Sequence, residues 1–388
     1  MYIWEDKAWS NFSFDMNAIK PRLEKVLALQ KQLIGKAKDL PEDLDRQAEM
    51  DALIQDAIKT SQIEGEKLNV GSVRSSVARQ LGLEQAGLPP ATRKTENLIA
   101  MLCAATTDLH QPISQQMLCE WQAALFPEPS IIKNIAIGKL RGDAPMQVVS
   151  QKGNGEIIHF EAPPKSQLQQ VLDEFIEWFN LAQPLKMHGI VRAAITHLRL
   201  ITIHPFDDGN GRVTRALTDR ALAQDEQTGI RFYSLSAAIE ANRAAYYKIL
   251  ENTQNCKTKI QLESNHATNI TEWINWFLET LALAMQQGQQ RIERVVIKTR
   301  FWQTHSQTIL SESQMKVLNR LLDNTGEEFT DGINASKYQG IAGVSKATAT
   351  RHLTELLKKG CLKQLPGGGR STRYVIGCSS ADKLDGEQ

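Results

Sequence analysis

Apolar residues recur every three or four positions along most of this chain, and this spacing is typical of amphipathic helices. One such stripe runs from Leu23 to Ile34, and a second helix is expected from near Pro41 to Glu64, where Gly65 ends it. Further helices are expected within residues 95–125 and over 166–180, 188–203, 211–223, 238–252 and 270–301. The pattern therefore predicts a mainly α protein.

A β-hairpin is expected at residues 146–160. Two apolar, partly β-branched runs, Met146–Val149 and Ile157–Phe160, flank the turn sequence Lys152–Gly155, and Pro163 follows the second run. This hairpin is the main β-signal that precedes the C-terminal segment.

The C-terminal segment differs from the rest of the chain in charge. Residues 323–334 are polar and predict a linker, and residues 336–376 then hold eight Lys or Arg against the single acid Glu355. This segment reads as a helix, a turn, a second helix capped by Ser345 and a hairpin around Gly367–Gly369, the order of a winged helix-turn-helix domain. The expected domains are an N-terminal helical domain at 1–92, a central domain at 93–300 and the winged-helix domain at 301–388.

Composition excludes several classes of protein. The 388 residues are 41% hydrophobic with a formal net charge of +1, so no global field favours nucleic acid or a membrane surface. No apolar run approaches the roughly 18 residues of a membrane span, and the N-terminus lacks the features of a signal peptide. The five cysteines are scattered without CxxC spacing, which argues against a disulfide framework or a zinc site. We therefore expect a cytoplasmic protein with no membrane partner.

The most informative stretch is His204–Arg212, followed one helical turn later by Arg215. It ends an apolar helix, turns and opens another helix. A histidine at that edge can act as a base, and the turn Gly209–Gly211 at a helix N-terminus can bind anions. Arg212 and Arg215 share one helical face and can hold phosphate oxygens.

Asp208 would repel phosphates in such a site unless a cation lay between them. A hard divalent ion such as Mg²⁺, held by one carboxylate and by phosphate oxygens, resolves this conflict. The residues therefore predict a site for a nucleotide polyphosphate with Mg²⁺.

The stretch from His204 to Arg215 resembles the signature HxFx[D/E]GNGRxxR of the Fic (filamentation-induced-by-cAMP) family without a mismatch. The likeness extends over roughly residues 95–290, with the 146–160 hairpin in the place of the family's flap. It implies a Fic-type helical bundle and transfer of AMP from ATP to a Ser, Thr or Tyr hydroxyl of a protein.

The resemblance also implies a role for each motif residue. His204 would deprotonate the target hydroxyl, Phe206 would anchor the loop, and Asp208 would hold Mg²⁺. Phosphate oxygens would be bound by Gly209, Asn210, Gly211, Arg212 and Arg215. Asn242 and Tyr247 match a helix that borders the nucleotide base in relatives.

Upstream, Thr60–Gly65 resembles the family's autoinhibitory motif, [S/T]xxxE[G/N]. In relatives its glutamate pairs with the second arginine of the signature and displaces the γ-phosphate. The resemblance therefore implies that Glu64, with Thr60 and Gly65, inhibits the site by pairing with Arg215. From the residues alone, Glu64 could instead merely end a polar helix.

Two roles stay open for the C-terminal segment. Lys346, Thr348 and Arg351 on its second helix, with Arg370 and Arg373 on the wing, could contact DNA phosphates and base edges. Winged helices also dock proteins, including a second copy of the same chain as a homodimer.

Three function classes compete. The first is a protein adenylyltransferase that needs His204 and ATP and modifies a hydroxyl-bearing protein, with the chain itself among its targets. The second is a nucleotide-sensing, DNA-binding transcriptional regulator. The third is a related enzyme that removes AMP or catalyses another phosphotransfer. The complete signature favours the first, since a pure sensor has no need of His204.

Overall fold

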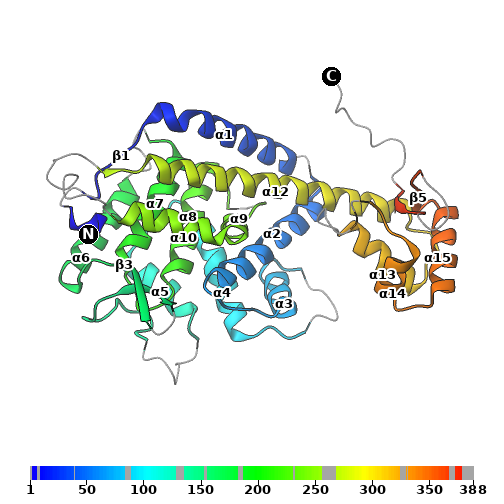
Figure 1. Ribbon diagram of the computed structural model, residues 1–388, viewed down its shortest axis with the longest axis horizontal. Helices are drawn as coiled ribbons and strands as arrows, with labels where there is room; N and C mark the ends of the chain where they lie inside the picture. The colour runs from blue at the N-terminus through cyan, green and yellow to red at the C-terminus, as the bar shows by residue number, and fades with distance from the viewer. Residues whose placement is uncertain are drawn as a thin grey trace. The chain divides into compact units, whose positions relative to one another are not determined.

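The protein was studied as a computed structural model, and helices dominate it (Figure 1). The structure describes residues 2–6, 9–38, 40–83, 89–127, 135–152, 155–181, 187–229, 232–255, 268–323, 329, 331–366 and 372–377. The expectation of a mainly α protein is confirmed.

Contacts divide the chain into two compact units, Met1–Gln289 and Gln290–Gln388. The boundary falls within helix α12 (Thr271–Thr304), upstream of the expected boundary at residue 300. The first unit is not divided further, so the separate domain at 1–92 stays a prediction.

The first unit begins with a short 3-10 helix η1 (Ile3–Glu5), strand β1 (Phe12–Ser13) and two long helices. These helices are α1 (Met16–Lys38) and α2 (Glu42–Ile63), and both lie where the apolar spacing predicts them. Leu23, Val26 and Leu33 are buried on α1, so the predicted stripe is the face that packs.

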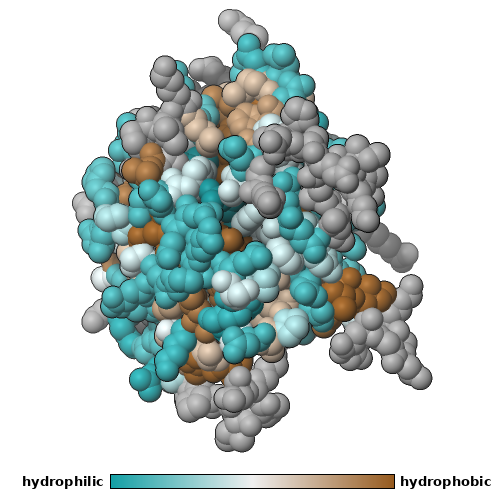
Figure 2. Space-filling view, turned by 90° about the vertical axis from the view of Figure 1, so that its left-hand side faces the viewer, coloured by the Kyte–Doolittle hydropathy of each residue, from teal (hydrophilic) through white to brown (hydrophobic). Residues whose placement is uncertain are grey.

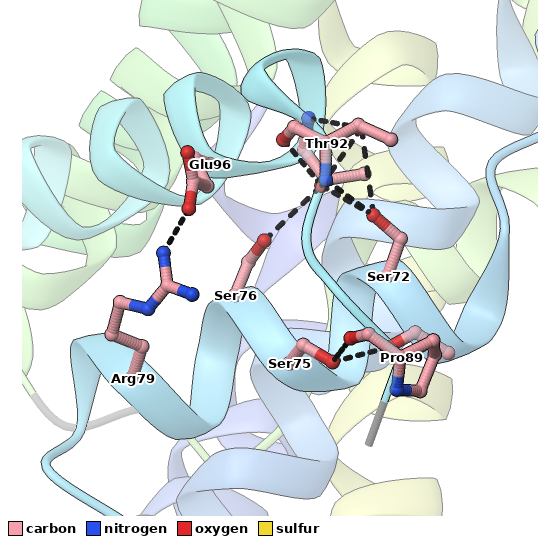
Figure 3. Close-up of polar contacts among 9 residues, drawn as sticks. Ser72, Ser75, Ser76, Arg79, Pro89, Thr92 and Glu96 are labelled. Carbon is pink, nitrogen blue, oxygen red and sulfur yellow. Dashed lines mark hydrogen bonds and ion pairs between the residues drawn. The ribbon is translucent and has the colours of Figure 1, made fainter.

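Helix α3 (Val70–Gln80) is absent from the sequence expectations because its serines and glycine are poor helix formers. Asn69 caps it by accepting from the Ser72 N–H at 3.0 Å. Small buried side chains let α3 pack against α4 (Arg93–Thr106), and Ser72 and Ser76 point toward the start of α4 (Figure 3). Their hydroxyl oxygens lie 2.8 and 3.1 Å from Thr95 Oγ1. Tertiary packing therefore outweighs low propensity here.

Two helices form the centre of the first unit. These are α7 (Gly189–Ile203) and α8 (Asn210–Glu226), and every residue from Ile190 to Ile203 is buried. Around them lie α5 (Gln115–Ala124) and α6 (Lys165–Leu181), which contributes Leu168, Leu172 and Phe175 to the core. The loop between α7 and α8 is consequently fixed at both ends by buried structure.

The expected hairpin is confirmed. Strands β2 (Gln147–Lys152) and β3 (Gly155–Glu161) pair antiparallel from Gln147↔Glu161 to Lys152↔Gly155, with an irregularity between Val148 and Val149. The turn residues 153–154 lie outside the described part. The hairpin exposes Val149, Ile157 and Ile158, whereas the end of the unit near α6 and the N-terminus is mostly hydrophilic (Figure 2).

The expected single helix at 238–252 is wrong. It is two helices, α9 (Leu235–Ala241) and α10 (Arg243–Gln254), because Asn242 adopts the non-helical angles φ −132° and ψ 48°. Strand β4 (Thr268–Asn269) then pairs in parallel with β1, and α12 follows.

The second unit contains α13 (Glu312–Leu322), α14 (Ala335–Ala342), α15 (Lys346–Lys358) and the antiparallel strands β5 (Leu362–Gln364) and β6 (Tyr374–Ile376). The predicted linker at 323–334 is wrong, since Phe329 and Ile333 are buried in this unit's core and Ile333 forms a β-bridge with Tyr374. The order of helices and hairpin is the one expected of a winged helix, and that assignment stays a prediction.

Within the described residues, no helix has the length and apolar composition that crossing a membrane requires. Cys103, Cys119 and Cys361 are free thiols, and Cys256 and Cys378 lie outside the described residues.

Candidate functional site

The loop between α7 and α8 turns by means of two left-handed residues. His204 caps α7 with φ 51° and ψ 59°, and its N–H donates to the Leu200 carbonyl at 3.0 Å. Gly209 precedes α8 with φ 89° and ψ 0°. A side chain at Gly209 would also lie 3.0 Å from Leu125 Cδ1 and 3.2 Å from Phe126 Cε2, so both backbone angle and space require glycine.

Asn210 closes this loop. Its Oδ1 accepts from the Phe206 N–H at 2.9 Å and its Nδ2 donates to the Phe206 carbonyl at 2.7 Å. Phe206 itself is fully buried. The side chain of Asn210 therefore shapes the loop, which leaves only its backbone N–H, in the first turn of α8, to bind an anion.

The hydrogen bond of His204 fixes its tautomer. Nδ1 lies 3.1 Å from the Ile201 carbonyl oxygen, which can only accept, so Nδ1 carries the proton and Nε2 holds the lone pair. Burial lowers the pKa of His204 below its usual range, and the Arg141 charge acts in the same direction against Glu64 and Asp208. His204 is therefore a neutral base near pH 7.

Arg141 holds the backbone of the loop from outside the motif. Its N–H donates to the Pro205 carbonyl at 3.0 Å, its Nε donates to the His204 carbonyl at 2.9 Å, and its Nη2 donates to the Pro163 carbonyl. The residue is only 2% exposed. One buried guanidinium thus connects the His204 turn to the segment that follows the hairpin.

Arg215 is bound by the end of α2. Its Nε donates to Thr60 Oγ1 at 2.7 Å, and its Nη2 donates to the Thr60 carbonyl at 2.9 Å and to Glu64 Oε1 at 2.8 Å. Burial alone would raise the pKa of Glu64, but the Arg215 charge and hydrogen bond outweigh it and lower that pKa. The pair is therefore ionised at neutral pH.

The Glu64 carboxylate lies against Gly211, in the glycine turn at the start of α8. A Cβ added to Gly211 would overlap Glu64 Oε1 and would lie 3.0 Å from Arg215 Nη1. The carboxylate thus rests on the first turn of α8, where an anion is favoured by free N–H groups and by the helix dipole.

Arg212 is bound by a second acid, Glu66. Its Nη1 donates to Glu66 Oε2 at 3.0 Å, and the other carboxylate oxygen pairs with Lys94. The guanidinium also lies 5.3 Å from the Phe126 ring centroid and 3.7 Å from Asp208 Oδ1. Its side chain is 7% exposed, so this charge is nearly desolvated.

A buried chain of hydrogen bonds joins Thr218, His197 and Tyr246 close to the Arg215 charge. Thr218 donates to the Thr214 carbonyl, so its oxygen accepts from His197 Nδ1–H at 3.0 Å, and His197 Nε2 accepts from the Tyr246 hydroxyl at 3.0 Å. Burial lowers the pKa of His197 to about 3, which keeps the ring neutral. The Tyr246 ring is buried beside the Arg215 charge.

Of the two residues predicted to border the base, Asn242 forms the break between α9 and α10 and Tyr247 lies in α10. Tyr247 is 38% exposed, its hydroxyl donates to the Ile63 carbonyl at 3.2 Å, and Arg243 lies 5.5 Å from its ring centroid. Asn242 is exposed, and its carbonyl accepts from the Tyr246 N–H at 3.2 Å. Their contact with a nucleotide base stays a prediction.

Asp208 could hold a metal ion only with help from a ligand. Its Oδ1 accepts from the Gly209 N–H at 2.6 Å, and its side chain is 39% exposed. Among the described residues no group of three or more His, Cys, Asp or Glu side chains could hold a metal. One exposed carboxylate fits Mg²⁺, which commonly uses few protein ligands together with phosphate oxygens and water.

The predicted DNA-contacting residues lie in the second unit. Lys346 and Arg351 are exposed on α15, with Arg351 Nε 3.8 Å from Glu355 Oε1. Thr348 lies at the start of α15, where its N–H donates to the capping Ser345 hydroxyl at 3.2 Å. Arg373 is half-buried beside β6, and Arg370 lies outside the described residues.

Sequence reasoning did not identify Glu66, Lys94 or His197 as parts of the site, nor the contacts that Arg141 and Tyr246 make there. Arg141 lies far from the motif in sequence, and nothing local marks its carbonyl partners. Glu66 had a usable signal, since it stands two residues after Glu64 in the same helix-terminating turn.

Comparison with known proteins agrees with the motif. Residues 112–222 match the model of the Fic/DOC family, and residues 2–83 match a domain of unknown function, DUF4172. A protein adenylyltransferase Fic of Culex quinquefasciatus is 40% identical over 60 residues, which cover 16% of this chain and 12% of that protein. One of Drosophila ananassae is 24% identical over 178 residues, covering 46% and 33%.

The chain thus spans about a tenth to a third of the length of these relatives. Among solved structures, a Fic family protein from Desulfovibrio desulfuricans matches 94% of this chain and 98% of its own at 15% identity and a TM-score of 0.48. Fic-1 from C. elegans matches 72% of each chain at 19% identity and a TM-score of 0.45. At such TM-scores these two likenesses add nothing to the assignment, which rests on the domain at residues 112–222. Residues 112–222, which carry the motif from His204 to Arg215, therefore form a domain that matches the Fic/DOC family.

Proposed function

We propose that this protein is an adenylyltransferase that transfers AMP from ATP to a hydroxyl side chain of a protein. The observation that carries the proposal is the tautomer of His204, whose Nδ1 is bound to Ile201 while Nε2 keeps its lone pair, in the loop that leads into the helix carrying the buried guanidiniums of Arg212 and Arg215. A neutral imidazole next to a polyphosphate site is the pairing that activation of a hydroxyl requires.

In the proposed reaction, His204 Nε2 takes the proton of the target hydroxyl as its oxygen attacks the α-phosphorus of ATP. The new P–O bond forms, the bond between the α-phosphorus and the bridging oxygen breaks, and pyrophosphate leaves. Arg212 and Arg215 would neutralise phosphate charge, and the N-terminal turn of α8 would bind phosphate oxygens through Gly211 and its neighbours.

Mg²⁺ would be held on the phosphates by Asp208 and would offset their charge. Other residues of this chain would shape the loop and border the nucleotide base. Asn210 and Arg141 would keep the loop in shape, and Tyr247 and Asn242 would border the base.

We also propose that the protein as described is in an inhibited state. Glu64 lies against Gly211 and binds Arg215, so a phosphate group directed at that guanidinium would meet a carboxylate instead. Removal of this carboxylate should therefore activate the protein.

Incubation of a cell lysate with labelled ATP analogue and Glu64→Gly protein tests both proposals. We expect labelled target proteins that are absent with wild-type protein and with the Glu64→Gly, His204→Ala double variant. Labelling that persists without His204 would reject the proposed base. Loss of pre-existing AMP from targets, without consumption of ATP, would favour the reverse reaction.

We also propose a second role, DNA binding, for the second unit. Its helix α15 exposes Lys346 and Arg351 within a segment whose order of elements suits a winged helix. Retention of the full chain on a DNA column that falls with rising salt, and that a Lys346→Ala, Arg351→Ala variant lacks, would support it. Failure to bind at low salt would favour the docking of a protein, such as a second copy of this chain.

A further inference from the structure

A second acid follows Glu64 by two residues, and the local backbone presents both acids together. The Glu66 N–H donates to the Ser61 carbonyl at 2.9 Å and the Gly65 N–H donates to the Gln62 carbonyl at 2.9 Å. Gly65 has φ 79°. These two bonds and the left-handed glycine form a Schellman motif, in which Glu64 is the last residue of the helix end and Glu66 is the second residue beyond it.

The two acids meet the two arginines of the motif one to one. Glu64 Oε1 lies 2.8 Å from Arg215 Nη2, and Glu66 Oε2 lies 3.0 Å from Arg212 Nη1. Both guanidiniums are nearly buried, so each pairing acts at low dielectric, where a charge partner matters most.

Each arginine keeps a donor that the protein does not use. Among the described residues, Arg212 Nε and Arg215 Nη1 are buried and have no hydrogen-bond partner. Buried donors without partners are costly, and an anion larger than a carboxylate would satisfy them. The site is therefore built for more acceptor oxygens than the two glutamates supply.

Glu66 also bridges two cations, Arg212 and Lys94. Lys94 lies in the first turn of α4, and the start of α4 is fixed to α3 by hydroxyl contacts, among them the Thr92 N–H to Ser72 Oγ at 2.9 Å (Figure 3). Lys94 and Arg212 bind the two oxygens of one carboxylate, so the two cations lie close enough to share an anion of similar size.

We propose that Glu64 and Glu66 form a two-carboxylate lock, in which Glu66 fills an anion subsite made by Arg212 and Lys94 that takes a phosphate group when the lock opens. The inference rests on the proposed nucleotide site and adds Lys94 to its phosphate-binding residues. If the inference holds, removal of Glu64 alone frees only Arg215 for phosphate, because Arg212 is still paired with Glu66.

Isothermal titration of the full chain tests this lock without any turnover. The probes are inorganic tripolyphosphate and ATP with Mg²⁺, and the variants are Glu64→Ala, Glu66→Ala and the double variant. We expect each single variant to bind tripolyphosphate roughly tenfold more tightly than wild type, and the double variant to bind it more tightly than either. Lys94→Met in the Glu66→Ala background should lose part of that gain.

Glu96→Ala is the matched control, because Glu96 lies in α4, two residues after Lys94, and pairs with an arginine, Arg79, that is not part of the motif. A dissociation constant of Glu66→Ala equal to that of the control, in both the wild-type and the Glu64→Ala backgrounds, would overturn the lock. Tighter tripolyphosphate binding with no AMP transfer by any variant would leave the lock standing and reject the proposed function.

Discussion

The Glu64 carboxylate lies 2.8 Å from Arg215 Nη2 and directly against the backbone of Gly211. The Glu64 side chain thus binds the Arg215 guanidinium and also covers the glycine turn. The sequence predicts that phosphate binds at both places. Activity should therefore depend on the conformation of the turn that carries Glu64 as strongly as on the motif itself.

Replacement of Gly65 by alanine should loosen the inhibitory turn. Gly65 has φ 79° and open space around its Cβ position, so alanine would strain only the backbone, by about 1 kcal/mol. We expect tighter ATP binding by titration, because both acids lose their fixed position. Gly82→Ala is the control, since Gly82 has φ 68° and equal space at the end of α3; the same gain in that variant would refute a specific role for the turn.

Arg141→Met should change the pH dependence of the reaction through the pKa of His204, which loss of stability alone would not do. Removal of the Arg141 charge takes away one cause that lowers the His204 pKa, so that pKa should rise. In the activated Glu64→Gly background, the acid limb of kcat/KM should move to higher pH as kcat falls. Arg141→Lys retains the charge and should keep the limb in place; a shift of equal size in Arg141→Lys would contradict this explanation.

Asn210→Ala should destabilise the loop rather than only weaken nucleotide binding. The variant removes both hydrogen bonds to Phe206 and leaves its buried N–H and carbonyl unpaired, at a cost of about 1–3 kcal/mol. Urea unfolding should show a lower midpoint without ligand. An unchanged midpoint would mean that Asn210 acts only on the ligand.

Stability should fall as pH is lowered from 6.5, in part through His197. Its pKa of about 3 in the folded protein lies below the usual 6.5, so the unfolded chain binds the proton more readily between these values. Stability from this group is therefore complete above pH 6.5 and falls by up to about 1.4 kcal/mol per pH unit below it. His197→Gln should show a shallower slope of unfolding free energy between pH 6.5 and 5, and an identical slope would count against this origin.

Much of this architecture could be predicted from the sequence, and the misses have physical causes. The helical spacing found α1, α2, α7 and α8 because each buries one stripe or its whole surface. Helix α3 escaped because packing of its small side chains on α4, not propensity, stabilises it. The break at Asn242 depends on backbone angles that no local pattern indicated.

The site residues also separate into those that the sequence predicted and those that it missed. His204, Arg212 and Arg215 could be found because their spacing along one loop and one helix already implies their chemistry. Arg141 and Lys94 act across long sequence separations, through carbonyl groups and through Glu66, which spacing does not reveal. The Schellman turn was visible as Glu–Gly–Glu after a helix, yet only its contact with Arg212 shows what the second acid does.

The most direct measurement follows label from ATP into the Glu64→Gly protein, with the label placed on either the α- or the γ-phosphorus. Covalent label should come from the α-phosphorus only, stay low in the wild type, and disappear when His204→Ala is added. Label that arrives from the γ-phosphorus, or that is independent of His204, would contradict AMP transfer by this site.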